Sequence, residues 1–320
     1  MNKLCLRGGK TQSERNYFVL KYEKMATVYT YQNSNVAKTY FLMGLFLVIV
    51  IGLGYFISAY YGNPAILYIA IIFSLIMNVA SYFWSDKIVL SVSKARPASR
   101  EEFFDLYTVT ENLSITAGLP MPKVYVVDDP APNAFATGRN KEHAVVCATT
   151  GLLQKLDRQE LEGVIAHELS HIGNRDILLM SSVVVLVGFV SIISNIFLRG
   201  MMFGGGRRNN DGEAGGILAI VGIILIVLSP IIATLIKLAI SRRREFLADA
   251  SGALLTRYPE GLARALEKIS AYNMPMKTAN TATAHLFISN PFGNKGTAIS
   301  NLFQTHPPIA ERIKILRDME

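Results

Sequence analysis

Two histidines and a glutamate occur at a spacing that suits metal-dependent hydrolysis. They form the motif His167-Glu168-Leu169-Ser170-His171. On an α-helix, residues four apart project from one face, because a turn takes 3.6 residues. Both imidazoles can therefore reach one zinc ion, with the intervening glutamate beside the position that water occupies. The motif predicts a zinc-dependent hydrolase in which Glu168 is the general base.

The motif lies in a segment with the features of a helix. Asp157 is a predicted N-cap, and Glu160, three residues on, completes a capping box. The alternative is a surface helix whose histidines align by chance, and the helical context argues against it. An apolar face at helical spacing follows the cap, formed by Leu161, Val164, Ile165, Leu169 and Ile172.

A zinc hydrolase needs a third protein ligand and one open position. The residue six positions after His171 is Ile177, so a third histidine at that spacing is absent. Glu245 is the strongest remaining candidate, and Asp249 lies four residues after it. On a helix these two carboxylates share a face. One of the two is predicted to bind the metal and the other to accept the free N–H of a ligand histidine; with Glu245 as the stronger candidate for the ligand, Asp249 takes the second role. Two ordinary surface acids are the alternative.

The composition favours a membrane protein, because 51% of the residues are hydrophobic and only 18% are charged. Uncharged apolar runs long enough to cross about 30 Å of hydrocarbon occur four times. Gly62-Asn63-Pro64 separates the first two runs, and a Gly-rich polar stretch, 199–216, separates the last two. The sequence therefore predicts four transmembrane helices in two hairpins, at residues 40–85 and 177–240.

Basic residues indicate the orientation of these spans. Lysine and arginine cluster before the first run and after the second and fourth, whereas the first turn is uncharged. The positive-inside rule then places both termini and both soluble segments in the cytoplasm. The net charge of +8 is concentrated near the membrane and requires no nucleic-acid partner. The remaining domains are predicted to be a basic N-terminal segment and two cytosolic parts of one hydrolase domain: 1–39, 86–176 and 241–320.

The second hairpin is predicted to bring the two halves of the site together. His171 precedes the third run by six residues, about 9 Å if one helix is continuous. Glu245 follows the fourth run by about nine residues, roughly 13 Å along a helix. Both arms of the hairpin return to the same membrane face, so both half-sites are expected at the cytosolic surface.

A small β-sheet is predicted beside the helices. Residues 123–127 and 143–148 have the composition of short strands, and a Pro-rich loop between them contains Asn133-Ala134-Phe135-Ala136-Thr137-Gly138. Zinc proteases usually hold substrate as an added strand at a sheet edge next to the metal. Residues 133–138 either form that edge or belong to a plain hairpin. The predicted fold class is mainly α with a small β-sheet.

A late histidine is a further candidate. Thr305-His306-Pro307-Pro308 is followed by Arg312, and the prolines suit the first turn of a helix. His306 would stabilise an oxyanion and Arg312 would orient it, whereas a purely structural histidine is the alternative. Cys5 and Cys147 form no disulfide framework and fit a reducing cytosol. No cleavable signal peptide is evident, and Met25 is an alternative start to Met1.

The chain resembles the HtpX-type membrane zinc endopeptidases, a heat-shock protease family related to the CAAX prenyl proteases. The resemblance covers about residues 36–318 and implies a gluzincin-like domain on the cytosolic side of a bacterial inner membrane. It implies one Zn²⁺ per chain and substrates that are misfolded or damaged membrane proteins or unfolded polypeptides. It also implies that His306 belongs near the active site, with Asn133 and Arg312 at the substrate. The matching segments are 133–138, 167–171, 245–249 and 305–308 with Arg312.

Three other functions are weighed against this one. A prenyl-CAAX protease has seven spans in its family, and four are predicted here. A non-catalytic scaffold or metal-binding regulator would not need an intact Glu168. A transporter would need ionisable groups within the apolar runs, and the four runs contain none. The residues do not distinguish Zn²⁺ from another divalent metal.

Overall fold

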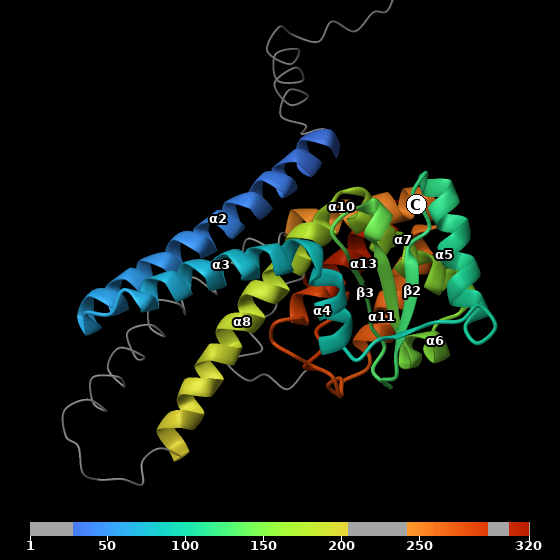
Figure 1. Cartoon of the computed structure of the whole chain (residues 1–320). Coiled ribbons are helices and arrows are strands. Elements are labelled where there is room, and N and C mark those ends of the chain that lie inside the picture. The colour runs from blue at the N-terminus through green and yellow to red at the C-terminus, as the bar shows by residue number, and fades with distance from the viewer. Residues whose placement is uncertain (1–27, 204–241, 294–306, 320) are drawn as a thin grey trace, which may run out of the picture.

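A computed structural model describes residues 28–203, 242–293 and 307–319 of the 320-residue chain (Figure 1). This described part is mainly helical with one small sheet, as predicted. The strands are β1 (Arg96–Pro97), β2 (Lys123–Val127), β3 (Ala134–Thr137) and β4 (Val145–Thr149). The helices are α2 (Val28–Tyr61), α3 (Ala65–Phe83), α4 (Ser85–Val92), α5 (Phe104–Ala117), α6 (Thr150–Lys155), α7 (Arg158–Gly173), α8 (Asp176–Phe203), α10 (Arg242–Thr256), α11 (Pro259–Ser270) and α13 (Ile309–Arg317), with 3₁₀ turns η1 (Lys141–His143) and η2 (Ala284–Leu286).

The first predicted hairpin is present as α2 and α3, two long helices that pack side by side (Figure 1). Gly62 adopts a φ of 63° at the turn between them. Large apolar side chains such as Val48 and Ile69 are exposed on the outer faces. Both helices are long and apolar enough to cross a membrane.

The second predicted hairpin is supported in part. Residues 176–189 of α8 pass the same test together with α7, as one bent pair. The described residues therefore contain two candidate spans, or three if the bent pair counts as one. The fourth predicted run, 217–236, lies outside the described residues, so the full set of four spans stays a prediction.

The expectation of one continuous helix from His171 into the third apolar run is wrong. Helix α7 ends at Gly173, α8 begins at Asp176, and the two are bent by 84°. Arg175, between them, adopts a φ of 58°, which a right-handed helix does not accommodate. The bend lets α7 pack against α5, α10 and α11 while α8 packs against α2, α3 and α4.

The sheet has the strand order β1-β2-β4-β3, with β2 and β4 parallel and β3 antiparallel to β4. The prediction for residues 123–127 matches β2. Strand β4 begins two residues later than predicted, because residues 141–143 form the η1 turn. Among the described strands β3 is both an edge strand and one arm of a hairpin, so the two interpretations of residues 133–138 are compatible.

Helix α7 lies at the centre of the part that contains the sheet, packed against α5, α10 and α11 (Figure 1). Gly163 permits the close crossing of α7 and α11, because a Cβ there would lie 2.6 Å from the backbone nitrogen of Leu262. One hydrophobic cluster joins the sheet to α5, α7 and α11, and a second joins it to α2, α4 and α8. The central helix is thus held from several sides.

Candidate active site

The helix that carries the motif is fixed at its N-terminus by the predicted capping box. The Asp157 carboxylate accepts a hydrogen bond from the Glu160 backbone N–H at 3.0 Å, and the Glu160 carboxylate accepts one from the Asp157 N–H at 2.9 Å. Two backbone donors at the start of α7 are therefore paired. The rest of the helix buries both histidines of the motif.

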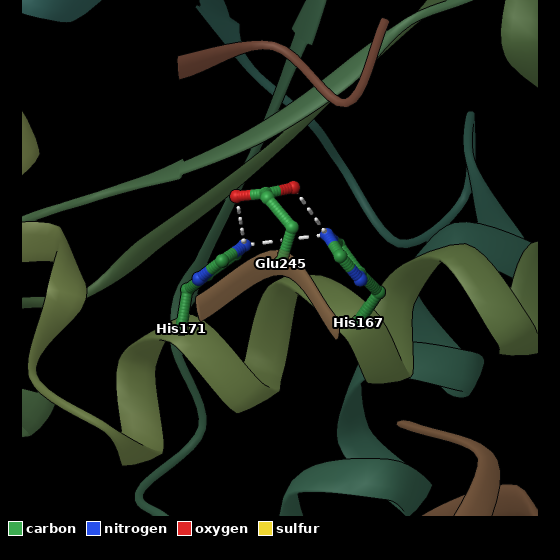
Figure 2. Close-up of side chains that lie close together, drawn as sticks. All are labelled: His167, His171 and Glu245. Carbon is green, nitrogen blue, oxygen red and sulfur yellow. Dashed lines mark hydrogen bonds and ion pairs between the residues drawn. The ribbon is translucent and has the colours of Figure 1, made fainter. Parts of the chain in front are cut away.

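Three predicted ligands converge at one point (Figure 2). The Nε2 atoms of His167 and His171 lie 3.2 Å apart. The two carboxylate oxygens of Glu245, on α10, each lie 3.7 Å from one of these nitrogens. One donor atom from each residue falls within 4.8 Å of the others, and all three residues are buried.

This donor set fits a zinc ion. Two nitrogens bound to one tetrahedral zinc at about 2.1 Å lie about 3.4 Å apart, close to the observed separation of the imidazoles. Two imidazoles and one carboxylate also form the ligand set of one class of catalytic zinc site, which leaves a fourth position for water or substrate. The geometry therefore fits the predicted ligands His167, His171 and Glu245, whose role in metal binding stays a prediction.

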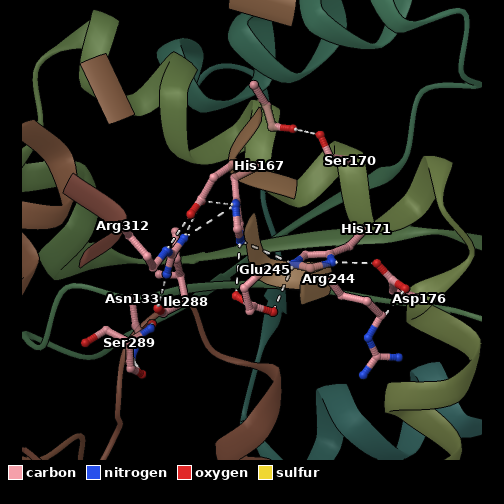
Figure 3. A network of polar contacts seen from close by, with 12 residues as sticks. Asn133, His167, Ser170, His171, Asp176, Arg244, Glu245, Ile288, Ser289 and Arg312 are labelled. Atoms are coloured by element: carbon pink, nitrogen blue, oxygen red, sulfur yellow. Dashed lines mark hydrogen bonds and ion pairs between the residues drawn. The ribbon is translucent and has the colours of Figure 1, made fainter. Parts of the chain in front are cut away.

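Each histidine is oriented by a carboxylate behind it. The Nδ1 atom of His167 lies 2.9 Å from Oδ1 of Asp249, and Nδ1 of His171 lies 2.9 Å from Oδ2 of Asp176 (Figure 3). A carboxylate at Nδ1 favours the proton there and leaves the Nε2 lone pair for a metal. Asp249 occupies the place that the sequence predicted for it.

The sequence did not single out Asp176. Its signal was a lone acidic residue directly before a long apolar run, five positions after the second histidine of the motif. Burial lowers the pKa of His171, but the hydrogen bond to Asp176 and the charge of Glu245 raise it to about 9. A ring protonated on both nitrogens cannot bind a metal, so metal binding at His171 must release a proton.

A buried arginine holds the other carboxylate. Arg312, on α13, donates from Nε and Nη2 to the two oxygens of Asp249 at 2.8 and 2.6 Å, and from Nη1 to the backbone oxygen of Ile288 at 3.3 Å. Burial raises the pKa of Asp249, but the charge of Arg312 and the His167 hydrogen bond bring it to about 2. Asp249 therefore remains a carboxylate at neutral pH.

A glycine brings Glu245 close to the histidines. Helix α10 crosses α7 at Gly252, where an added Cβ would lie 3.0 Å from the backbone nitrogen of His167. Even an alanine Cβ at this position would require its neighbours on α7 to shift by a few tenths of an ångström. The third candidate ligand therefore depends on the close packing of α10 against the helix that carries the other two.

Glu168 is buried and lies next to the edge strand. Burial is the main cause that raises its pKa, to about 7, and the positive charge of His171 opposes that rise. Its carboxylate also accepts a hydrogen bond from the backbone N–H of Ala136 in β3. The predicted general base is thus adjacent to β3, for which a substrate-binding edge was one of the two interpretations of the sequence.

The two residues predicted to contact substrate are buried in the structure. Asn133 donates from Nδ2 to the Ser289 backbone oxygen at 2.9 Å and accepts from the Ser289 N–H at 3.2 Å. The next residue of β3, Ala134, accepts from the Ile288 N–H at 3.0 Å. Asn133 therefore attaches residues 288–289 to the start of β3, and Arg312 pairs with Asp249. His306 lies outside the described residues.

Comparison with known proteins finds one family model, close sequence relatives and a similar solved structure. The model of Peptidase family M48 matches residues 100–320. The Protease HtpX homolog of Caldanaerobacter subterraneus subsp. tengcongensis is 49% identical over 298 residues, which cover 92% of this chain and 98% of that protein. The Protease HtpX homolog of Thermococcus sibiricus is 47% identical over 283 residues, with coverages of 88% and 94%. The crystal structure of S. mikatae Ste24p covers 88% of this chain and 67% of that chain, with a TM-score of 0.48 and 19% identity.

Proposed function

Since the chain belongs to peptidase family M48 and is a metallopeptidase of the HtpX type, we propose that it cleaves misfolded or damaged membrane proteins at the cytosolic face of a bacterial inner membrane. The observation that carries this proposal is the buried convergence of His167, His171 and Glu245 beside Glu168. The complete set of predicted ligands, together with a candidate base, favours an enzyme over a scaffold.

We assign His167, His171 and Glu245 as the residues that would hold one Zn²⁺. When bound, such an ion acts as a Lewis acid that favours loss of a proton from water and polarises the scissile carbonyl. Asp249 and Asp176 hold the two imidazoles in the orientation that this binding requires. Arg312 keeps Asp249 ionised and fixed in place.

Glu168 is assigned the proton transfers. It takes the proton of the attacking water and delivers it to the nitrogen of the departing amine, so one carboxylate serves both halves of the hydrolysis. The backbone hydrogen bond from Ala136 keeps this carboxylate close to β3. A peptide extended along that strand would place its scissile bond beside the base.

Three further residues were expected to act on substrate. His306 is proposed to stabilise the oxyanion of the tetrahedral intermediate. Asn133 is hydrogen-bonded to Ser289, and Arg312 is hydrogen-bonded to Asp249. We therefore propose that these two residues hold the walls of the substrate site in place and do not contact the peptide.

The apolar helices support the proposed membrane location and client class. The site lies at the bend where α7 meets α8, and α8 packs against the two candidate spans α2 and α3. A peptidase held this close to the hydrocarbon has access to the loops of other membrane proteins. The distribution of basic residues favours the cytoplasmic side for both the site and the termini.

The catalytic proposal is tested by comparing two glutamates on one helix. Wild type, Glu168→Gln and Glu162→Gln are purified in detergent, loaded with Zn²⁺ and given an unfolded protein as substrate. Glu162 is a matched control because it pairs with Arg158 on the outer side of α7. Glu168→Gln should bind zinc but lose turnover, whereas Glu162→Gln should remain active. An active Glu168→Gln protein would contradict the mechanism.

The client and orientation proposals need a membrane. Inverted inner-membrane vesicles, which expose the cytoplasmic face, should cleave an added loop peptide of a destabilised membrane protein without detergent. Right-side-out vesicles should leave the same peptide intact until they are permeabilised. The reverse pattern would place the site on the other side of the membrane.

A further inference from the structure

The carboxylate behind His171 has a second partner, which comes from the first apolar helix. Nδ2 of Asn35, in α2, donates to Oδ1 of Asp176 at 2.6 Å, while Oδ2 of the same carboxylate lies 2.9 Å from Nδ1 of His171. Asn35 and Asp176 are both buried, at 2% and 1% exposure. An unbroken chain of hydrogen bonds thus runs from α2 through Asp176 to a predicted metal ligand.

The same stretch of α2 braces the bend between α7 and α8. Nδ2 of Asn35 also lies 3.2 Å from the backbone oxygen of Asn174, and Nε2 of Gln32 donates to the backbone oxygen of Gly173 at 2.7 Å. These two carbonyls lie where α7 ends and the chain turns toward α8. Helix α2 therefore supplies side-chain donors to a helix end that would otherwise have unpaired acceptors.

We propose that Asn35 is a positioning residue for the metal site. An imidazole keeps its orientation only if the carboxylate at its Nδ1 is itself held. Asn35 donates the short hydrogen bond to the Asp176 oxygen that His171 does not use, and Nε of Arg244 lies 3.9 Å from the same oxygen. Both neighbours of the Asn35 amide nitrogen are acceptors, so its role as donor follows from the contacts. The first span is then a working part of the active site as well as an anchor. This inference rests on the proposed zinc site.

A purely structural role for Asn35 would be to dock α2 on the bend. Gln32 provides the comparison, because it contacts the same bend from the same helix but only at the backbone of Gly173. If docking alone matters, loss of either side chain should have the same effect on zinc. If Asn35 acts through Asp176, only its loss should weaken the metal site.

The experiment measures the zinc dissociation constant of the full-length protein in detergent, by competition with a chelator of known affinity. Wild type, Asn35→Ala, Gln32→Ala, Asp176→Asn and the double variant Asn35→Ala/Asp176→Asn are compared. Loss of a group that orients a metal-binding histidine typically weakens metal affinity by about 10–100-fold. We expect about tenfold for Asn35→Ala, less than about twofold for Gln32→Ala, and no further loss in the double variant beyond Asp176→Asn alone.

A second variant and a second measurement distinguish a specific effect on the metal site from misfolding of Asn35→Ala. Asn35→Asp keeps the size of the side chain but places a carboxylate against Asp176, so it should weaken zinc binding more than Asn35→Ala does. The absorption spectrum of the Co²⁺-loaded protein should change in both Asn35 variants and remain that of wild type in Gln32→Ala.

The outcomes separate this inference from the proposed function. A wild type that binds zinc, with Asn35 variants that bind it equally well, overturns the role of Asn35 alone. Equal losses in Asn35→Ala and Gln32→Ala also overturn it, in favour of docking. A wild type that binds no zinc overturns the metal site and this inference together.

Discussion

Replacement of Arg312 by methionine tests whether the metal-site carboxylate needs its buried partner. Arg312 is 0% exposed and Asp249 is 1% exposed, and two hydrogen bonds of 2.6 and 2.8 Å join them. Arg312→Met keeps an apolar side chain of similar length but leaves a buried carboxylate without its cation. Breaking a buried ion pair in this way costs about 3–5 kcal/mol. At roughly 2–4 °C per kcal/mol, the midpoint of thermal unfolding should fall by about 6–20 °C.

The assay is scanning calorimetry of the detergent-purified protein, with two comparisons. Arg317→Met, on the same helix, removes an exposed arginine that pairs with Glu260 and Glu267, and it should leave the midpoint nearly unchanged. The double variant Arg312→Met/Asp249→Asn removes the stranded charge and should recover most of the lost stability. A midpoint for Arg312→Met within about 3 °C of wild type, or a double variant less stable than the single one, would refute the reasoning.

Two further changes address how the ligands are brought together. Gly252→Ala places a Cβ 3.0 Å from the backbone nitrogen of His167, and it should cost about 1–3 kcal/mol of stability and weaken zinc binding, as calorimetry and chelator competition will measure. Gly173→Ala is its control, because an added Cβ there meets nothing within 4 Å, and an equal loss in both variants would contradict the argument. Zinc removal by a chelator should lower the unfolding midpoint reversibly, because zinc at a thousandfold excess over its dissociation constant stabilises the folded protein by about 4 kcal/mol. A midpoint insensitive to the chelator would contradict zinc binding to the folded protein.

The predictable part of the site is the part set by local periodicity. His167 and His171 are four residues apart, and so are Glu245 and Asp249. A helix is enough to place each pair on one face, and both segments are helical. The capping box of α7 was readable for the same reason, because its two residues lie three apart. Strand β2 and the helical hairpin of α2 and α3 also follow from local composition.

The unpredicted part depends on the bend and on distant contacts. Arg175 adopts a left-handed backbone conformation. Glycine is the residue that usually indicates such a conformation in a sequence, so an arginine gave no sign of it, and the expectation of a continuous helix after His171 was wrong. The pairing of Asn35 with Asp176 joins residues 141 positions apart, and it arises only once the bend has turned Asp176 toward α2. Arg312 was expected at the substrate, and its burial against Asp249 depends on how α13 packs on α10.

The pairing of Arg312 with Asp249 also has a consequence for the newly made chain. His167 precedes by 145 residues the arginine that completes its support. At translation rates of roughly 5–20 residues per second, the ribosome needs about 7–29 s to cover that distance. During this interval the histidines have been synthesised, but the arginine that holds the carboxylate behind His167 does not yet exist. The active site of such a nascent chain is incomplete. The chain therefore becomes an active peptidase only late in synthesis, after the apolar segments between the two halves of the site have been made.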